Sequence, residues 1–268
     1  MINTKCLRPI AYENLIRIGR SNDGGYVIPK KIFSICDGLL SYGINKDWSF
    51  EKDFWKRSPK AIIHCYDHTI NFLSLLKFSF KSFLFSVIYL ILLDRIRFLK
   101  SFNGLFVLPD YCSFFKGNRT YFKKRISNDK KKNVITIDDT LDLISRAGSK
   151  NIFLKMDIET AEYNVLHSVL NTKMNIVGLV IEFHKIDHYD KEFNALINAF
   201  LHHYYIVHIH GNNYSRVIER SNFSSTVEIT FLHKKYVNRT VEKSTKNYPI
   251  GGLDQPNRFS RPDHELRF

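Results

Sequence analysis

The stretch Asn151–Glu162, NIFLKMDIETAE, determines the expected fold because it changes from apolar to acidic within a few residues. Its apolar half predicts a short buried strand, and a helical pattern follows its acidic half. Three carboxylates, Asp157, Glu159 and Glu162, lie between the two. Ligands of open α/β sheets bind beyond the carboxyl ends of strands. These carboxylates therefore either cap the following helix, where anions are stabilised, or serve binding and chemistry.

Composition indicates a globular protein. The chain has 268 residues, of which 44% are hydrophobic, enough for a sizeable core in one large domain. Its four cysteines are scattered without a C-x-x-C pair, which argues against zinc ribbons and redox motifs. The N-terminal segment 1–9 is polar and lacks the apolar region of a signal peptide. We therefore expect a cytoplasmic protein. A membrane-peripheral location is the alternative.

The net charge of +14 calls for an anionic partner or reflects a lysine-rich composition. Nucleic acid, an anionic membrane and an acidic glycan or nucleotide substrate are all compatible with this charge. The sequence contains no helix-turn-helix, zinc-finger or RNP pattern, so we expect no specific nucleic-acid partner. Oligomeric state is left open.

A first strand-to-helix turn is predicted in Gly38–Glu51, where a buried strand ends at Gly43 and a helix begins near Ser49. The turn has the place of a nucleotide-binding loop, but it lacks the G-x-G-x-x-G fingerprint. A second buried strand within Ala61–Ile70 ends at Asp67, where an acidic residue is placed to bind a ribose diol. The alternative is that Asp67 caps the next helix.

Residues 71–132 form a long apolar and basic segment that we expect to be an insertion. Its uncharged run Ser82–Leu93 is shorter than the roughly 20 residues that a membrane span needs. We predict a buried helix of the fold; the alternative is a helix that touches an anionic membrane, because basic residues flank it. Gly104–Asp110 predicts a third strand, and Lys123–Lys132 predicts a solvated basic loop.

A further buried strand, Asn175–His184, ends in the polar pair Glu182 and His184. His188 follows, and E-x-H-x-x-x-H has the residue types of a metal site. The strand is expected to end at His184, which removes the helical spacing that such ligands need. We therefore expect no metal, and a helix over Asp190–His203.

The last strands follow this helix. Tyr204–Tyr214 predicts a strand that ends in His210, Asn212 and Asn213. Thr226–Lys234 alternates like a half-exposed antiparallel strand. Strands alternating with helices, followed by such a hairpin, predict an α/β three-layer sandwich. We expect a single domain with a mostly parallel seven-stranded sheet and a C-terminal antiparallel strand.

Near the N-terminus, Asp23, Gly24 and Gly25 form a turn signal in which both glycines permit positive φ. A strand over residues 26–28 follows. The turn is either a plain hairpin or a loop whose bare backbone approaches a ligand.

Six motifs in this order resemble those of one protein family: RIGRSNDGGYV, LSYGINKDWSFE, IHCYDHT, LKMDIETAEYNVL, GLVIEFH and VHIHGNN. The chain resembles the FkbM-type methyltransferases, which have the Rossmann-like class I fold, over about Arg17–Leu232. Such proteins usually have glycine where this chain has Thr160. The segment 71–132 has no residue-by-residue match to the family.

The resemblance implies S-adenosylmethionine as cofactor. It assigns the cofactor site to the first turn and to two strand ends: Gly43, Asn45, Asp47, Ser49, Glu51, Asp67 and Asp157. It assigns the catalytic side to three residues: His184, Asp157 and Glu182. We expect the acceptor to contact polar groups around it: Asp23, Gly24, Glu159, Glu162, His210, Asn212 and Asn213.

We predict that His184 is the base, because a neutral imidazole accepts protons near pH 7 and a neighbouring carboxylate raises its pKa. Two alternatives stay open: Asp157 takes the proton itself, or His184 ligates a metal together with Asp157.

The expected activity, by analogy with the family, is O-methylation of a sugar hydroxyl of a glycan or glycan precursor. The alternative is a non-catalytic methyltransferase-like module that binds nucleic acid or an anionic membrane through Lys123–Lys132 and the Ser82–Leu93 helix.

Overall fold

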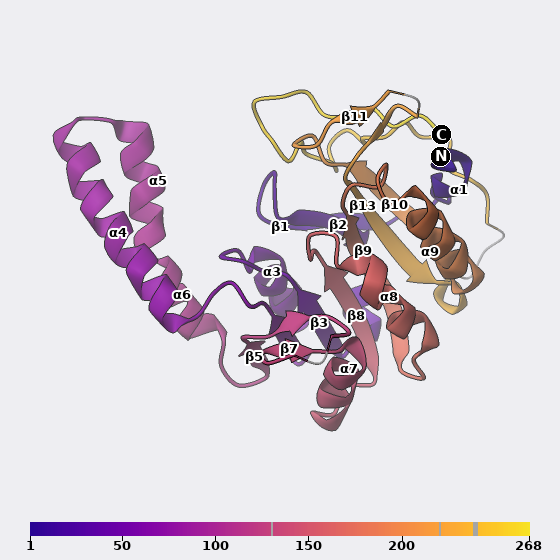
Figure 1. Ribbon diagram of the computed structural model, residues 1–268, viewed down its shortest axis with the longest axis horizontal. Coiled ribbons are helices and arrows are strands. Elements are labelled where there is room, and N and C mark those ends of the chain that lie inside the picture. Colours follow the sequence, from indigo (N-terminus) through magenta and orange to yellow (C-terminus); the bar gives the residue numbers. More distant parts are fainter. Residues whose placement is uncertain (130, 220, 238–240) are drawn as a thin grey trace.

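The computed structural model describes residues 1–129, 131–219, 221–237 and 241–268, and a seven-stranded sheet lies at its centre (Figure 1). The strand order is β10-β13-β9-β8-β3-β4-β5. Its strands are β3 (Gly38–Tyr42), β4 (Ile62–Tyr66), β5 (Arg119–Phe122), β8 (Asn151–Met156), β9 (Asn175–Phe183), β10 (Tyr204–Gly211) and β13 (Val227–His233). Only β13 runs antiparallel to its sheet neighbours. The mixed α/β class and the mostly parallel seven-stranded sheet are therefore confirmed.

Two apolar cores pack against the sheet because successive strand residues point to opposite faces. Leu40 and Leu154 belong to one core and Leu39 and Phe153 to the other. Helices α7 (Ile137–Arg146), α8 (Glu162–Asn171) and α9 (Asp190–His203) contribute to the first core, and α2 (Ile32–Ile35) and α3 (Ser49–Arg57) to the second. With both faces of the central strands covered, their carboxyl ends are left as the place for a site.

Short elements complete the chain. They are α1 (Thr4–Leu7), β1 (Leu15–Gly19), β2 (Gly25–Pro29), β6 (Arg125–Ile126), β7 (Val134–Ile135), β11 (Val217–Ile218), β12 (Phe223–Ser224) and the 3-10 turn η1 (Lys234–Tyr236). Strands β1 and β2 form an antiparallel hairpin, so the turn at Asp23 and Gly24 is a hairpin turn.

A helical hairpin extends from one end of the sheet, well away from the body (Figure 1). It consists of α4 (Phe72–Ile91) and α5 (Arg95–Leu105), followed by α6 (Val107–Phe114). The predicted strand over Gly104–Asp110 is therefore wrong: these residues end α5 and begin α6, and β5 takes the place of the third strand.

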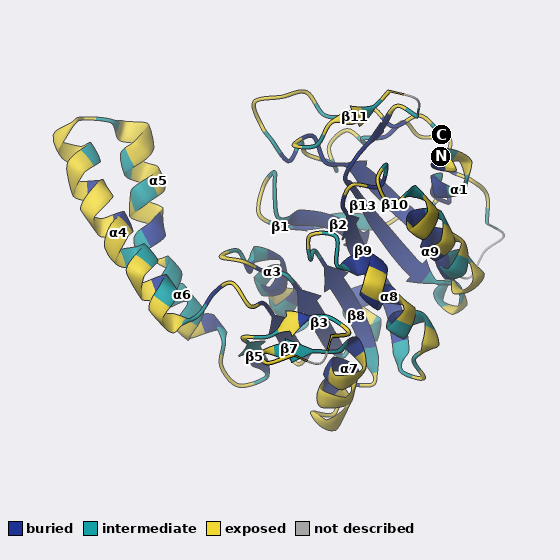
Figure 2. Ribbon diagram, in the orientation of Figure 1, coloured by how far each residue is buried: buried dark blue, intermediate teal, exposed yellow. Residues whose placement is uncertain are grey.

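The predicted burial of Ser82–Leu93 is also wrong. The run belongs to α4, in which only Leu75, Ser82 and Ser86 are buried (Figure 2). Helix α4 begins ten residues before the run, and the capping box of Asn71 marks its start. The helix is longer than the uncharged run because Lys77 and Lys81 lie at exposed positions, where a charged side chain does not interrupt a helix. Among the described residues, α4 is the one helix long and apolar enough to cross a membrane by length and composition.

Two smaller expectations are corrected. Strand β13 is buried rather than half-exposed, because it inserts between β9 and β10 instead of lying at the sheet edge. Helix α3 starts at Ser49, so Ser49 is not its N-cap. The side chain of Asp47 instead accepts the Ser49 N–H at 3.0 Å.

Candidate functional site

The site is built where β3 and β8 end side by side. Gly43 follows β3 with φ of +74°, and a Cβ there would lie 1.7 Å from the Asp157 carbonyl oxygen. Only glycine fits such a close approach at positive φ. The turn is held further by the Asp157 N–H, which donates to the Tyr42 carbonyl at 2.9 Å, and by the Gly43 N–H, which donates to the Tyr66 carbonyl at 3.0 Å.

Asp67, which follows β4, organises this turn. One of its oxygens accepts the N–H groups of Ile44 and Asn45 at 3.0 and 2.8 Å. The other accepts the N–H and hydroxyl of Thr69 at 2.6 and 2.5 Å. Asp67 therefore does not cap the next helix, because the N-cap of α4 is Asn71. Its carboxylate instead holds the predicted nucleotide loop in shape.

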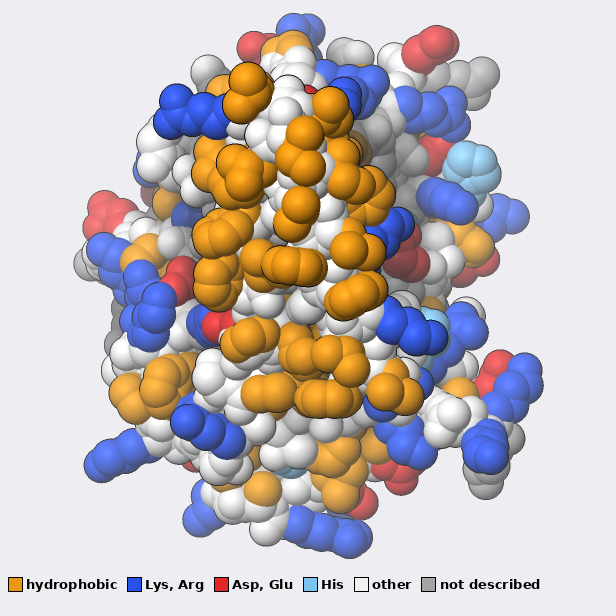
Figure 3. All heavy atoms as spheres, turned by 90° about the vertical axis from the view of Figure 1, so that its left-hand side faces the viewer, with side chains coloured by type: hydrophobic (Ala, Val, Ile, Leu, Met, Phe, Trp, Pro, Cys, Tyr) orange, Lys and Arg blue, Asp and Glu red, His pale blue; other side chains and the backbone are white. Residues whose placement is uncertain are grey.

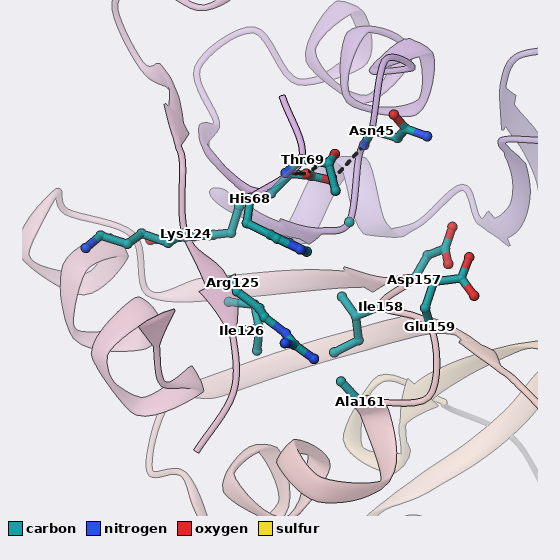
Figure 4. A pocket seen from close by; sticks show the side chains of 13 residues that line it. Asn45, His68, Thr69, Lys124, Arg125, Ile126, Asp157, Ile158, Glu159 and Ala161 are labelled. Atoms are coloured by element: carbon teal, nitrogen blue, oxygen red, sulfur yellow. Dashed lines mark hydrogen bonds between the residues drawn. The ribbon is translucent and has the colours of Figure 1, made fainter. Parts of the chain in front are cut away.

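A pocket of about 410 Å³ opens beside this turn (Figure 4). Its wall contains apolar side chains and the polar groups of three strand ends: Gly43, Asn45, Tyr66, Asp67, His68, Thr69, Lys124, Arg125, Ile126, Asp157, Ile158, Glu159 and Ala161. Arg125 points toward Ile158 and Ala161 (Figure 4). The basic run after β5 is thus partly a pocket wall and not wholly a solvated loop, although Lys130 lies outside the described residues.

A second pocket, of about 540 Å³, adjoins the first. It is lined by Arg20, Asp23, Gly24, Tyr26, Gly43, Ile44, Asn45, Lys46, Asp47, Phe50, Glu51, Lys155, Asp157, Glu159, Glu182, His184, Asn212, Tyr214, Ser215 and Thr226. Gly43, Asn45, Asp157 and Glu159 line both pockets. The two pockets are therefore neighbours on either side of this shared rim, whereas Glu182 and His184 line only the second.

His184 lies at the centre of a group of carboxylates. Its Nδ1 lies 3.2 Å from a Glu162 oxygen, which also accepts the His184 backbone N–H at 2.8 Å. Its Nε2 lies 3.6 Å from Asp157 and 3.8 Å from both Glu159 and Glu182. The Nδ1 contact orients the ring, and the longer Nε2 distances leave that nitrogen available to a ligand.

The protonation of this group follows from its burial. Burial alone would lower the pKa of His184, but the hydrogen bond to Glu162 and the charges of Glu182, Glu162 and Asp157 raise it to about 9. Burial, together with the neighbouring Asp157 and Glu228 carboxylates, raises the pKa of Glu182 well above its usual value. The pKa of His184 is thus raised, as expected, but at pH 7 the ring is mainly protonated rather than neutral.

In the second pocket, uncharged hydrogen-bond donors contact the carboxylates. The Tyr26 hydroxyl lies 3.2 Å from Glu182 and 3.4 Å from Asp157, and the Asn212 amide donates to Glu182 at 2.7 Å. Glu51 is buried in the wall, where Ser41 donates to one oxygen at 2.5 Å. Its other oxygen has no hydrogen-bond partner within the described chain, and burial raises the Glu51 pKa.

Ligand atoms of Asp157, Glu182 and His184 lie within 4.8 Å of one another, which is close enough for one divalent ion. His188, the other histidine of the sequence pattern, is exposed and pairs with Asp187 at 3.3 Å. The E-x-H-x-x-x-H pattern therefore does not converge, and the geometry keeps open only the alternative in which His184 and Asp157 share an ion.

Several predicted residues lie elsewhere. Glu162 is fully buried behind His184 and orients it, so it is a positioning residue and not a substrate contact. Ser49 is absent from both pocket walls, and its hydroxyl accepts the Arg20 N–H at 2.8 Å.

His210 and Asn213 are also corrected, because the C-terminal tail covers them. His210 contacts Asp263 at 2.9 Å, and Asn213 donates to the backbone carbonyls of Arg258, Arg261 and Pro262. Asn212, between them, does line the second pocket. The expected acceptor contacts Asp23, Gly24 and Glu159 line it too.

Sequence reasoning missed Tyr26, Lys155 and Arg125. Lys155 lies within β8 and donates to the Gly43 carbonyl at 2.6 Å, where it also lines the second pocket. A lysine inside an otherwise apolar strand is a signal that could have found it, since buried lysines need partners. Tyr26 and Arg125 carried no such signal.

The turn after Asp157 is strained. Glu159 and Thr160 have φ of +53° and +76°, a region in which a β-branched residue is an outlier. Thr160 stands where the family usually has glycine, and it adopts the conformation that glycine adopts without strain. The departure from the family pattern therefore leaves the positive-φ turn in place.

The comparison with protein families agrees with the resemblance. Residues 108–214 match the family described as Methyltransferase FkbM domain, a segment that includes Asp157, Glu182, His184 and Asn212. Among solved structures, the crystal structure of a fibrillarin/Nop5p complex is similar with a TM-score of 0.34 and 10% identity, covering 74% of this chain and 72% of that chain. No curated protein matches the sequence significantly. The family match over residues 108–214 confirms the resemblance to the FkbM methyltransferases and, with the α/β sheet, supports a methyltransferase.

Proposed function

We propose that this protein is an S-adenosylmethionine-dependent O-methyltransferase of the three-layer class I type, with a sugar hydroxyl of a glycan or glycan precursor as acceptor. The observation that carries the proposal is the pair of adjoining pockets, which share the rim of Gly43, Asn45, Asp157 and Glu159. Only the second pocket contains His184. A donor and an acceptor placed on either side of the rim would meet at the carboxylates.

The residues present fit the cofactor. Apolar Ile126 and Ile158 beside polar groups of the first pocket suit a nucleoside. Across the rim, the buried oxygen of Glu51 that has no partner among the described residues suits the amino group of the methionyl part. The Asp157 carboxylate suits a neighbouring positive charge. When bound, S-adenosylmethionine supplies a methyl group activated by its sulfonium.

The chain's own part in the reaction is positioning and proton transfer. Holding donor and acceptor in line supplies about 7–11 kcal/mol of barrier reduction. As the acceptor oxygen gains the methyl group, His184 takes its proton at Nε2 while Glu162 holds Nδ1. The second pocket suits a hydroxyl-rich acceptor, because hydrogen-bonding side chains such as Asp23, Asn212 and Tyr214 line it.

Calorimetric titration with S-adenosylmethionine and S-adenosylhomocysteine tests the proposal. We expect saturable binding that changes little between 50 and 500 mM salt, since a closed pocket is weakly screened. Methyl transfer to free and nucleotide-linked sugars then tests the acceptor class. If neither S-adenosylmethionine nor S-adenosylhomocysteine binds at millimolar concentration, the proposal that the protein is an enzyme is overturned. A steep salt dependence with RNA or DNA, without cofactor binding, would instead favour the non-catalytic module.

Asp67→Ala is expected to weaken S-adenosylhomocysteine binding by about tenfold or more, because it releases the turn that Asp67 holds through Ile44 and Asn45. Calorimetry measures the loss, and circular dichroism verifies the fold. Asp142→Ala, at an exposed position of α7, is the matched control. Unchanged affinity in folded Asp67→Ala would show that the turn keeps its shape without the carboxylate.

A further inference from the structure

In the 72–106 hairpin, made of α4 and α5, small residues are buried and large apolar residues are exposed, which is the reverse of the usual arrangement in water. Ser82, Ser86 and Gly104 are buried between its helices. A Cβ on Gly104 would lie 2.3 Å from the Ser82 hydroxyl, so the helices cross there at close range. Small residues between helices with large apolar residues outside are typical of helices packed in lipid.

Large apolar side chains are exposed along the whole length of the hairpin. Large side chains are exposed at Phe72, Leu73, Leu76, Phe80, Phe83, Leu84, Phe85, Val87, Ile88, Leu90, Ile91, Leu92, Leu93, Ile96, Leu99, Phe102 and Phe106. At the tip, Leu93 and Ile96 are 88% and 82% exposed. Patches of this extent on a soluble protein mark an interaction site.

The charges at the edges of this surface indicate which partner covers it. Residues 72–106 contain five basic side chains, Lys77, Lys81, Arg95, Arg97 and Lys100, and a single acidic one, Asp94. Figure 3 shows hydrophobic side chains gathered on the face of the molecule that carries the hairpin, with lysines and arginines along its margins. All five basic residues are exposed, whereas Asp94 caps α5 and pairs with Arg97 at 3.4 Å.

We propose that the 72–106 hairpin docks on an anionic membrane surface, with its apolar side chains in the acyl boundary and its basic side chains at the lipid phosphates. Helix α5 has 11 residues, about 16 Å, which is too short for the hydrocarbon core of about 30 Å, and it carries Arg95, Arg97 and Lys100. The hairpin therefore lies in the interface instead of crossing the membrane twice. A second copy of the chain fits less well, because it would bring the same basic margins together.

The base of the hairpin is fastened to the body beside the pockets. The Trp48 indole donates to Asp110 of α6 at 2.9 Å. Lys46, which lines the second pocket, lies over the Phe78 ring of α4 at 4.3 Å. Docking would thus hold the pockets near the membrane surface. The docking proposal itself stands whether or not the protein is a methyltransferase.

Co-sedimentation of the full chain with liposomes tests the proposal. The vesicles are pure phosphatidylcholine or phosphatidylcholine with 30% phosphatidylglycerol, at 50 and 500 mM salt. We expect binding to the anionic vesicles at low salt, with a large loss at high salt. The variant Ile91→Asn/Leu93→Asn/Ile96→Asn should bind at least tenfold more weakly, and Phe259→Asn, at an exposed apolar residue of the tail, should bind like the wild type.

Lys77→Gln/Lys81→Gln should weaken binding to the anionic vesicles by about fivefold per lysine, without affecting the thermal unfolding of the protein. Because all the replaced side chains are exposed, the fold should survive in both variants. Equal binding to both vesicle types, independent of salt, would overturn the anionic-surface proposal. The proposal would also be overturned if the chain bound no vesicles and formed, in light scattering, a stable dimer that the Ile91→Asn/Leu93→Asn/Ile96→Asn variant dissociates.

Discussion

His184→Ala is expected to lower kcat by about 10²–10⁴-fold while leaving the affinity for S-adenosylhomocysteine unchanged, because the groups proposed to hold the cofactor are Glu51, Asp157 and the wall of the first pocket, and His184 is not among them. The Glu162 carboxylate holds Nδ1, which fixes the tautomer in which neutral His184 accepts a proton at Nε2. The variant keeps both pockets but removes the proton acceptor. Single-turnover kinetics with the identified acceptor measures the chemical step.

The pH profile adds a readout that a merely structural role would not affect. Against the burial that would lower it, the Glu162 hydrogen bond and the nearby carboxylates raise the His184 pKa to about 9. At pH 7 only about one ring in a hundred is then neutral, so kcat/KM of the wild type should rise about tenfold per pH unit up to pH 9. In His184→Ala this acidic limb should disappear.

His188→Ala is the matched control, because His188 is exposed and pairs with Asp187 outside both pockets. It should keep wild-type turnover and the same pH profile. If His184→Ala retains kcat and raises only the acceptor KM, His184 binds the acceptor and Asp157 becomes the stronger base. If a chelator abolishes wild-type activity and a divalent ion restores it, Asp157, Glu182 and His184 share an ion instead.

The part of the site that could be predicted from sequence follows from one geometric rule. The carboxyl ends of neighbouring parallel strands meet at one edge of the sheet, so residues that end buried apolar runs come together. Gly43, Asp67, Asp157, Glu182 and His184 satisfy this rule, and each lines at least one of the two pockets. These strands were recognisable because both of their faces are buried and most of their residues are apolar.

The errors have equally definite physical causes. The Ser82–Leu93 run was predicted to be buried because it is apolar, but an apolar helix is buried in the fold only where other parts of the protein cover it. In α4, Ser82 and Ser86 are buried and the large apolar side chains are exposed. The alternation of Thr226–Lys234 indicated a half-exposed antiparallel strand, but the position of β13 between β9 and β10 depends on the chain returning into the sheet. Local patterns do not encode that insertion.

His210 was misassigned because its partners are distant in sequence. It follows the same rule as His184, at the end of a strand with polar neighbours. However, Asp263 lies 53 residues further on, in a tail without periodicity. The tail covers this end of the sheet and converts an expected substrate contact into an internal one.

His210→Ala is expected to lower the free energy of unfolding by about 3–5 kcal/mol, because it leaves the buried carboxylate of Glu228 and the partly buried one of Asp263 without their cation. His210 is 4% exposed, with Glu228 at 3.4 Å from Nδ1 and Asp263 at 2.9 Å from Nε2. Burial alone would lower the pKa of His210, but the hydrogen bonds to Asp263 and Glu228 raise it to about 10. Urea unfolding at pH 6 measures the loss.

The pH dependence gives the prediction its sign. The folded pKa of His210 lies above the unfolded value of about 6.5, so its stabilisation is complete below pH 6.5 and is lost as pH rises to about 10. The difference between His210→Ala and the wild type should therefore shrink over that range. His167→Ala, at an exposed position of α8, should unfold like the wild type at both ends of it. If His210→Ala keeps wild-type stability and instead raises the acceptor KM, the tail does not close over this strand end, and His210 returns to the acceptor site.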